Sequence, residues 1–267
     1  MGRIEKRFDQ LKAKGAKAFM PFVTACDPSP ETTVEIVSAL EDSGADIIEL
    51  GFAYSDPIAD GPVIQDSYAK VLESRRTVDD ALSVAEGIRK RSSIPLAAMV
   101  SYSIVWKRKP AEFAAAAARA GIDALIIPDL PPEEAGDMFD ALQSSPLGVV
   151  FLVTPNTDAR RLERIVAASR PFIYYVSVVG TTGARIQLPG DLSAGVRKVK
   201  SLTDKPVVVG FGVSTPAQAA SVAQIADGVI VGSALVRVIS EHRRDGSRAI
   251  VDAVRAFAGP MAEAVKG

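Results

Sequence analysis

The chain has 267 residues and a formal net charge of −1 at pH 7, because 31 Lys and Arg residues balance 32 Asp and Glu residues. This balance argues against a protein that binds nucleic acid or an anionic membrane surface. The single His and single Cys exclude a His-rich metal site within one chain and an internal disulfide, so we expect chemistry based on carboxylates, hydroxyls or backbone groups.

The N-terminal segment shows no targeting signal. Residues 1–7 are charged and lack the apolar core of a signal peptide. No uninterrupted apolar run approaches the roughly 18 residues that a membrane helix needs. The lone Cys26 fits a reducing compartment. We therefore expect a cytoplasmic protein that contacts neither a membrane nor nucleic acid.

Short apolar runs alternate with amphipathic segments along the chain. Several runs are rich in β-branched residues, as is typical of strands that are buried on both faces. We expect strands at residues 18–24, 45–50, 95–102, 123–128, 148–153, 172–178, 206–210 and 228–231. The segments between them, such as residues 31–43 and 111–120, space their apolar residues as helices do.

Local signals support this division into strands and helices. Ser29, Thr77 and Thr215 stand where N-caps are expected. Three similar junctions mark turns from a helix to a strand, at residues 44–46, 121–123 and 226–228.

Eight successive strand–helix units predict an α/β fold. We expect a single (β/α)8 TIM barrel over residues 1–267, with an extra N-terminal helix. An open doubly wound sheet is the alternative. Such a sheet carries a glycine-rich loop after its first strand, whereas residues 24–28 contain no glycine.

Glu49 is the first candidate for catalysis, because active sites of TIM barrels lie at the C-terminal ends of the strands. Period-2 alternation places Glu49 on one face with Ala45 and Ile47. If this face lines the interior, loss of solvent raises the pKa of the carboxyl group toward neutrality, which suits a general acid or base. A glutamate at a strand end, paired with a lysine from a loop, is the alternative interpretation.

The following loop carries Asp56 and Asp60. Asp60 precedes Gly61 and Pro62, and a helix is expected to start near Val63. The residue types alone therefore favour Asp60 as a helix cap.

Glycine-containing turns follow the last three predicted strands, at residues 180–183, 210–214 and 232–233. Backbone N–H groups and a helix N-terminus after strands seven and eight form the usual phosphate site of a barrel, so we expect a phosphate ester as substrate. No Lys interrupts the predicted strand interiors, which argues against a Schiff-base aldolase. The single His argues against a metal-dependent aldolase.

A longer motif resembles a known family. Glu49-Leu50-Gly51, followed by the run SDPIADGPVIQ at residues 55–65, closely resembles the signature of tryptophan synthase α subunits. Residues 21–24, 180–183, 210–212 and 232–234 fall in the order and spacing of that family, so the resemblance spans essentially the whole chain.

This resemblance implies a lyase of tryptophan biosynthesis. Such a lyase cleaves indole-3-glycerol phosphate to indole and D-glyceraldehyde 3-phosphate in a retro-aldol reaction without a cofactor. The resemblance also implies a partner, a β subunit that contains pyridoxal phosphate (PLP), in an α2β2 heterotetramer. Indole would pass to that partner.

The resemblance further implies roles for individual residues. Glu49 matches the acid–base carboxylate that protonates indole C3 and helps to remove the proton of the side-chain hydroxyl. Asp60 matches the carboxylate that binds the indole N–H, which favours this role over capping, and Tyr174 matches a tyrosine that supports the site. The residues expected to bind the rest of the substrate are Phe22, Ile64, Val100, Tyr102, Ile126, Thr182 and Phe211. Those expected to bind the phosphate are Gly183, Gly212, Gly232 and Ser233. Plain core packing is the alternative for the two phenylalanines.

Some positions depart from the usual pattern of the family. Ala53 stands where a proline is usual, and Ile104 stands where many members carry asparagine. Val178 and Val179 occupy the place of an arginine found in some members. The first two positions lie in surfaces that meet the β subunit in the family. A stand-alone lyase is therefore an alternative, as is a catalytically weak subunit that acts as an allosteric partner. A barrel that acts on another sugar phosphate is a further alternative.

Overall fold

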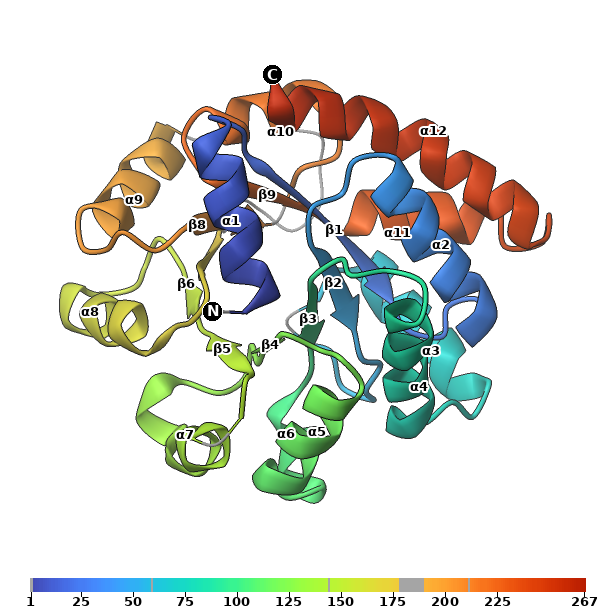
Figure 1. The fold of residues 1–267 in the computed structure, drawn as a ribbon, viewed down its shortest axis with the longest axis horizontal. Coiled ribbons are helices and arrows are strands. Elements are labelled where there is room, and N and C mark those ends of the chain that lie inside the picture. The colour runs from blue at the N-terminus through green and yellow to red at the C-terminus, as the bar shows by residue number, and fades with distance from the viewer. Residues whose placement is uncertain (1, 59, 144, 178–189, 211) are drawn as a thin grey trace.

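The computed structural model describes residues 2–58, 60–143, 145–177, 190–210 and 212–267. Within these residues, nine parallel strands form one sheet in the order β5-β4-β3-β2-β1-β9-β8-β7-β6. The strands are β1 (Ala18–Thr24), β2 (Ile48–Gly51), β3 (Leu96–Met99), β4 (Ala124–Ile126), β5 (Gly148–Val150), β6 (Leu152–Val153), β7 (Ile173–Val176), β8 (Val207–Gly210) and β9 (Gly228–Val231). Helices surround the sheet on its outer side (Figure 1).

The first and last strands in this order, β5 and β6, together correspond to the single strand expected at residues 148–153. β5 pairs with β4 and β6 pairs with β7, and only Phe151 separates β5 from β6. The backbone N–H of Phe151 donates to Ser169 Oγ at 3.1 Å rather than to a neighbouring strand, which explains the division. The sheet therefore forms a barrel, and each of the eight strand positions expected from the sequence is confirmed.

The helices begin where the sequence signals place them. The α-helices are α1 (Arg3–Ala13), α2 (Pro30–Asp42), α3 (Pro62–Glu73), α4 (Val78–Arg89), α5 (Tyr102–Lys107), α6 (Pro110–Arg119), α7 (Gly136–Leu142), α8 (Ala159–Ala168), α9 (Gly190–Lys200), α10 (Pro216–Ala223), α11 (Ser233–Glu241) and α12 (Ser247–Lys266), with a 3-10 turn at Pro132–Glu134. Ser29 caps α2, and Thr77 and Thr215 form capping boxes at α4 and α10. Among the described residues, none of the helices has both the length and the apolar character of a membrane span.

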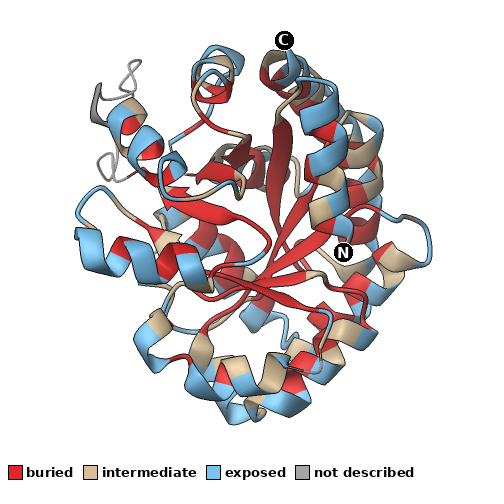
Figure 2. Ribbon diagram, turned by 60° about the vertical axis from the view of Figure 1, so that its left-hand side comes forward, coloured by how far each residue is buried: buried red, intermediate tan, exposed pale blue. Residues whose placement is uncertain are grey.

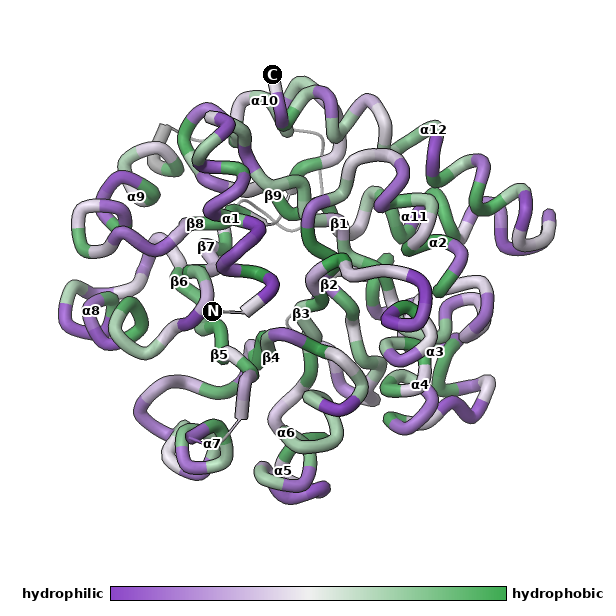
Figure 3. The backbone as a smooth tube through the Cα atoms, in the orientation of Figure 1, coloured by the Kyte–Doolittle hydropathy of each residue, from purple (hydrophilic) through white to green (hydrophobic). Residues whose placement is uncertain are grey.

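Successive residues of each strand point alternately into two apolar layers on opposite sides of the sheet. One layer lies between the sheet and the helices, and the other fills the inside of the barrel. The strands are mostly buried and apolar, with Thr24 and Glu49 as buried polar exceptions, whereas the helices turn exposed, polar faces outward (Figures 2 and 3). Ile47 belongs to the interior layer, as the alternation predicts, but Ala45 packs in the outer layer. The prediction for Ala45 is wrong because β2 begins only at Ile48, so the alternation does not extend back to Ala45.

The predicted extra N-terminal helix is α1, and it closes one end of the barrel. Ile4, Phe8 and Leu11 join the interior layer, and the ring of Phe8 lies 6.0 Å from that of Phe172. Figure 1 shows α1 crossing the middle of the ring of strands. The opposite end of the barrel, where the C-terminal ends of the strands meet, is not covered by α1. We therefore look for the active site at that end.

The three similar helix-to-strand junctions make the same contact at the closed end. In each junction an aspartate accepts a hydrogen bond from the backbone N–H at the start of the preceding strand in the barrel. These bonds join Asp46 to Phe19 (2.8 Å), Asp123 to Leu96 (2.8 Å) and Asp227 to Val207 (3.0 Å). The same carboxylates form ion pairs with Arg7, Arg3 and Lys200, respectively. Two of these cations, Arg3 and Arg7, come from α1, so the junctions also hold the closing helix.

Candidate active site

Glu49 faces the inside of the barrel. Its partners in the sheet register are Phe22 on β1 and Ala97 on β3, and both belong to the interior layer. Glu49 is only 1% exposed, and neither carboxylate oxygen has a hydrogen-bond partner among the residues that the structure describes. Burial, together with the nearby charge of Asp60, raises the pKa of Glu49 to about 8. The group therefore holds a proton at neutral pH, and the alternative of a lysine partner at a strand end is not what the structure shows.

Asp60 approaches the same site from the loop between β2 and α3. It is half-buried, and burial raises the pKa of its carboxyl group to about 6, while a hydrogen bond from Tyr54 acts in the opposite direction. Gln65 Nε2 holds the loop by donating to the backbone oxygen of Asp60 at 2.8 Å. The N-cap of α3 is Gly61, with no capping hydrogen bond from a side chain. The interpretation of Asp60 as a cap, drawn from residue types alone, is therefore wrong.

The two carboxyl groups differ in protonation although they lie close enough to interact. At pH 7 Glu49, with a pKa of about 8, is mostly protonated, and Asp60, with a pKa of about 6, is mostly ionised. Such a separation is how active sites assign an acid and an anion to two similar side chains. The arrangement can deliver a proton from Glu49 and stabilise a developing positive charge with Asp60.

Tyr174 on β7 reaches the same region from across the barrel. It is 2% exposed, and burial and the charges of Glu49 and Asp60 raise its pKa well above the ordinary value of 10.0. The phenol consequently keeps its proton, so its hydroxyl can donate or accept a hydrogen bond but does not act as a charged base. Gly210 at the end of β8 makes room for it, because a Cβ there would lie 2.4 Å from the Tyr174 hydroxyl.

Tyr68 on α3 is a neighbour of the site that the sequence reasoning missed. It is 1% exposed, and its ring centroid lies 5.7 Å from that of Tyr54. Burial, followed by the charges of Asp60 and Glu49, raises its pKa well above the ordinary value. A signal was present in the sequence, since Tyr68 follows Ile64 by four residues and so lies on the same face of α3.

The residues expected to surround an indole ring fall into two groups. Phe22, Ile64 and Ile126 lie together in the interior layer. Val100 is buried in the outer layer, and Tyr102 is partly buried against that layer. The structure therefore places Phe22, Ile64 and Ile126 in the layer that Glu49 faces, with Phe22 beside Glu49, whereas Val100 and Tyr102 follow β3 and pack against the other layer.

The predicted phosphate site lies next to the Asp60 loop. Gly232 is the N-cap residue of α11 and Ser233 is the first residue of the helix, with no side chain capping it. A Cβ on Gly61 would lie 3.9 Å from Ser233 Oγ, and one on Gly232 would lie 3.7 Å from Phe22 Cβ. The free N-terminus of α11 thus faces both the loop and the interior layer, where its N–H groups can bind an anion. Gly212, with a φ of +81°, follows β8, whereas Thr182, Gly183 and Phe211 lie outside the described residues.

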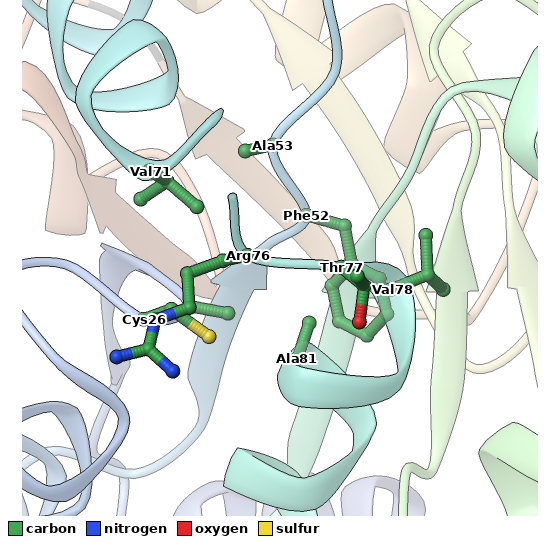
Figure 4. A pocket seen from close by; sticks show the side chains of 9 residues that line it. Cys26, Phe52, Ala53, Val71, Arg76, Thr77, Val78 and Ala81 are labelled. Atoms are coloured by element: carbon green, nitrogen blue, oxygen red, sulfur yellow. The ribbon is translucent and has the colours of Figure 1, made fainter. Parts of the chain in front are cut away.

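A separate small pocket lies outside the barrel interior, and its lining includes Cys26, Phe52, Ala53 and Arg76 (Figure 4). Burial raises the pKa of the Cys26 thiol to about 12, so it stays protonated and is a poor nucleophile. In the part of the chain that the structure describes, no group of three or more His, Cys, Asp or Glu residues is arranged to hold a metal ion.

Comparisons with known proteins agree on one family. A family model described as "Tryptophan synthase alpha chain" matches residues 8–266. The tryptophan synthase alpha chain of Geobacter sp. (strain M21) is 45% identical over 91% of this chain and 91% of its own length. That of Caulobacter sp. (strain K31) is 41% identical over 99% of this chain and 96% of its own length.

Solved structures give the same result. The crystal structure of tryptophan synthase subunit alpha from Legionella pneumophila str. Paris has a TM-score of 0.91 and 36% identity, covering 99% of this chain and 98% of that one. The aminoacrylate-bound form of tryptophan synthase from M. tuberculosis has a TM-score of 0.88 and 35% identity, covering 100% of both chains.

Proposed function

Because the chain belongs to the tryptophan synthase alpha chain family, we propose that Glu49 and Asp60 are the two groups with which it cleaves indole-3-glycerol phosphate. The chain is a lyase of tryptophan biosynthesis, and its products are indole and D-glyceraldehyde 3-phosphate. One observation carries the assignment of the residues. The buried carboxyl group of Glu49, which has no hydrogen-bond partner in the described part of the chain, lies inside the barrel near a second carboxyl group of lower pKa, that of Asp60.

The first step is transfer of the Glu49 proton to C3 of the indole ring. A carboxyl group with a pKa near the working pH is well suited to this transfer. Protonation leaves a positive charge that is shared between C2 and N1 of the ring. The Asp60 carboxylate accepts a hydrogen bond from the indole N–H and stabilises that charge in a site where little water screens it.

The second step breaks the bond between C3 and the side chain. The ionised Glu49 takes the proton of the adjacent side-chain hydroxyl, the oxygen forms the carbonyl of the aldehyde, and the electrons of the broken bond return to the ring. Glu49 thus gives one proton and regains one, so it ends in its starting state. Tyr174 supports both carboxylates by its fixed position and its retained proton.

Binding of the substrate uses the surroundings of these groups. We place the indole ring among Phe22, Ile64 and Ile126, and the phosphate at the N-terminus of α11. Gly212, Gly232 and Ser233 are the described residues of that phosphate site. Thr182, Gly183 and Phe211 stay predicted members of the site, as do Val100 and Tyr102. No step requires a cofactor, and we propose that this chain holds none.

We propose a PLP-containing β subunit as the partner, in an α2β2 assembly in the cytoplasm. Two large apolar side chains support a docking surface near the open end: Ile58, which is 92% exposed, and Trp106, which is 61% exposed. They follow β2 and β3, respectively. Ala53 and Ile104, the two departures from the usual pattern, are partly buried against the outer layer, so they do not remove this exposed surface.

The test is release of indole from indole-3-glycerol phosphate by the purified chain, measured with and without a tryptophan synthase β subunit. The proposal predicts release by the chain alone and a faster rate with the β subunit. Equal rates would favour a stand-alone lyase. Indole release in neither case, together with faster β-subunit turnover, would indicate an allosteric partner without catalysis of its own.

A further inference from the structure

A buried polar cluster lies beside the site, apart from the reacting carboxylates. It consists of Thr24, Asp27, Ser67 and Arg243, and we call it the Asp27 cluster. Asp27 is 3% exposed and Ser67 is 1% exposed. Ser67 hydrogen-bonds to the Asp27 carboxylate and lies 2.8 Å from Thr24 Oγ1. On the other side, Arg243 Nη2 lies 2.5 Å from Asp27 Oδ1. The mechanism described above uses none of these groups.

The Asp27 cluster joins the two helices that carry the ends of the site. Ser67 lies on α3, and Asp60 immediately precedes the first turn of this helix. Arg243 directly follows the C-terminal end of α11, whose N-terminus is the phosphate site. Asp27, just after β1, contacts both, and α11 packs against α3 and β1. A single carboxylate therefore ties the far end of the phosphate-binding helix to the helix behind Asp60.

Stability alone gives little reason for such a cluster. Burial raises the pKa of Asp27 above its ordinary value, against the opposing effects of Ser67 and Arg243. Asp27 Oδ1 and Arg243 Nη2 form an ion pair, and among the described residues neither atom has a further hydrogen-bond partner. Apolar residues of similar volume often serve stability as well as or better than a buried ion pair. What the ion pair and the hydrogen bond add is direction, because each requires particular atoms to face one another at a defined distance.

We propose that Asp27 is a positioning residue for the lyase reaction. Through Arg243 it fixes the direction of α11, and through Ser67 it fixes α3, so that the phosphate site keeps its distance from Asp60. The inference rests on the proposed function. α11 has 9 residues, so a tilt at its Arg243 end moves the N–H groups at the other end. Misplacement of a binding group by about 1 Å can lower a rate by about a hundredfold.

The main variant is Asp27→Asn, which keeps the shape and an acceptor for Ser67 but removes the charge that faces Arg243. We measure kcat and KM for indole-3-glycerol phosphate, and the dissociation constants of glycerol 3-phosphate and of indole by calorimetry. The expected result is a roughly tenfold rise in KM and in the dissociation constant of glycerol 3-phosphate. Binding of indole, which touches only the other end of the site, is expected to stay unchanged.

A matched control breaks another ion pair between a buried aspartate and a partly exposed arginine. Arg7→Met removes a cation from Asp46, whose side chain is fully buried at the closed end of the barrel. This variant is expected to lower stability without changing either dissociation constant. Arg243→Met breaks only the connection to α11 and is the replacement if Asp27→Asn does not fold. Arg243→Lys is expected to bind glycerol 3-phosphate more tightly than Arg243→Met does.

The outcomes separate this inference from the proposed function. Unchanged binding of glycerol 3-phosphate by Asp27→Asn would overturn the positioning role, and so would an equal loss for glycerol 3-phosphate and indole. Failure of the wild-type chain to release indole would instead overturn the proposed function. The calorimetric binding of glycerol 3-phosphate does not depend on turnover, so the two failures are distinguishable.

Discussion

Replacement of Glu49 by glutamine is expected to abolish cleavage and, at the same time, to stabilise the fold. Glutamine has nearly the same shape as glutamate but neither gives nor takes the proton that the reaction needs. Loss of a general acid–base group lowers a rate by about 10²- to 10⁴-fold. The stability gain follows from the surroundings of Glu49, which bury the carboxyl group away from bulk solvent and, among the described residues, give its charged form no hydrogen-bond partner.

The size of the gain depends on pH. The pKa of Glu49 rises from its ordinary value of 4.5 to about 8 in the folded chain, so the folded state holds the proton more tightly than the unfolded state. Below pH 4.5 both states are protonated and there is no penalty. The penalty grows as the pH rises and is complete above about 8. At about 1.4 kcal/mol per pKa unit, it is about 3 kcal/mol at pH 7.

The measurement is the free energy of unfolding in urea for wild type and Glu49→Gln at pH 5, 7 and 8.5. We expect a gain below about 1 kcal/mol at pH 5 and about 3 kcal/mol at pH 7, with a further increase at pH 8.5. Glu163→Gln, which changes an exposed glutamate of α8, serves as the control and is expected to change stability by less than about 0.5 kcal/mol. A gain that does not vary with pH, or a loss of stability at pH 8.5, would refute the account of Glu49 as a buried, unsolvated acid.

Three further predictions concern other parts of the molecule. Asp60→Asn is expected to lower kcat about a hundredfold. For the wild type, kcat/KM is expected to fall as the pH drops through about 6, because the Asp60 carboxylate gains a proton there. A pH–rate profile of both proteins checks these two expectations. Gly210→Ala brings a Cβ to 2.4 Å from the Tyr174 hydroxyl and is expected to lower stability by about 1 to 3 kcal/mol in urea unfolding. Gly259→Ala in α12, where a Cβ meets no atom within 4 Å, is the control and is expected to cause no loss. Trp106→Ala is expected to leave cleavage by the chain alone unchanged and to reduce activation by the β subunit about tenfold; an unchanged activation would remove Trp106 from the docking surface.

The sequence predicts the barrel because its signals are local. The apolar runs are short and continuous, and caps such as Ser29 and Thr215 need only their own helix. Glu49 is predicted to face inward from alternation within one strand, and its register partners confirm this. The prediction for Ala45 fails because the alternation is extended beyond the residue where β2 begins.

Features that depend on the tertiary fold were harder to predict. Asp60 has the residue type and position of a helix cap, and only the resemblance to a family pointed to its place beside Glu49. The Asp27 cluster was not predicted, because its members come from β1, α3 and the end of α11, and Asp27 and Ser67 are 40 residues apart. No local pattern marks such a pair before the strands and helices are packed.

The helix that closes the barrel also constrains when the chain can complete its fold during synthesis. α1 leaves the ribosome early, but its contacts are made with Asp46, Asp123 and Phe172. At about 5 to 20 residues per second, synthesis of the segment between α1 and Phe172 takes roughly 8 to 30 seconds. Throughout that interval the apolar face of α1, with Phe8 at its centre, has no barrel to enter. Chaperones that shield nascent apolar segments would therefore act on α1 for longer than on a helix such as α6, which packs against neighbours close to it in sequence.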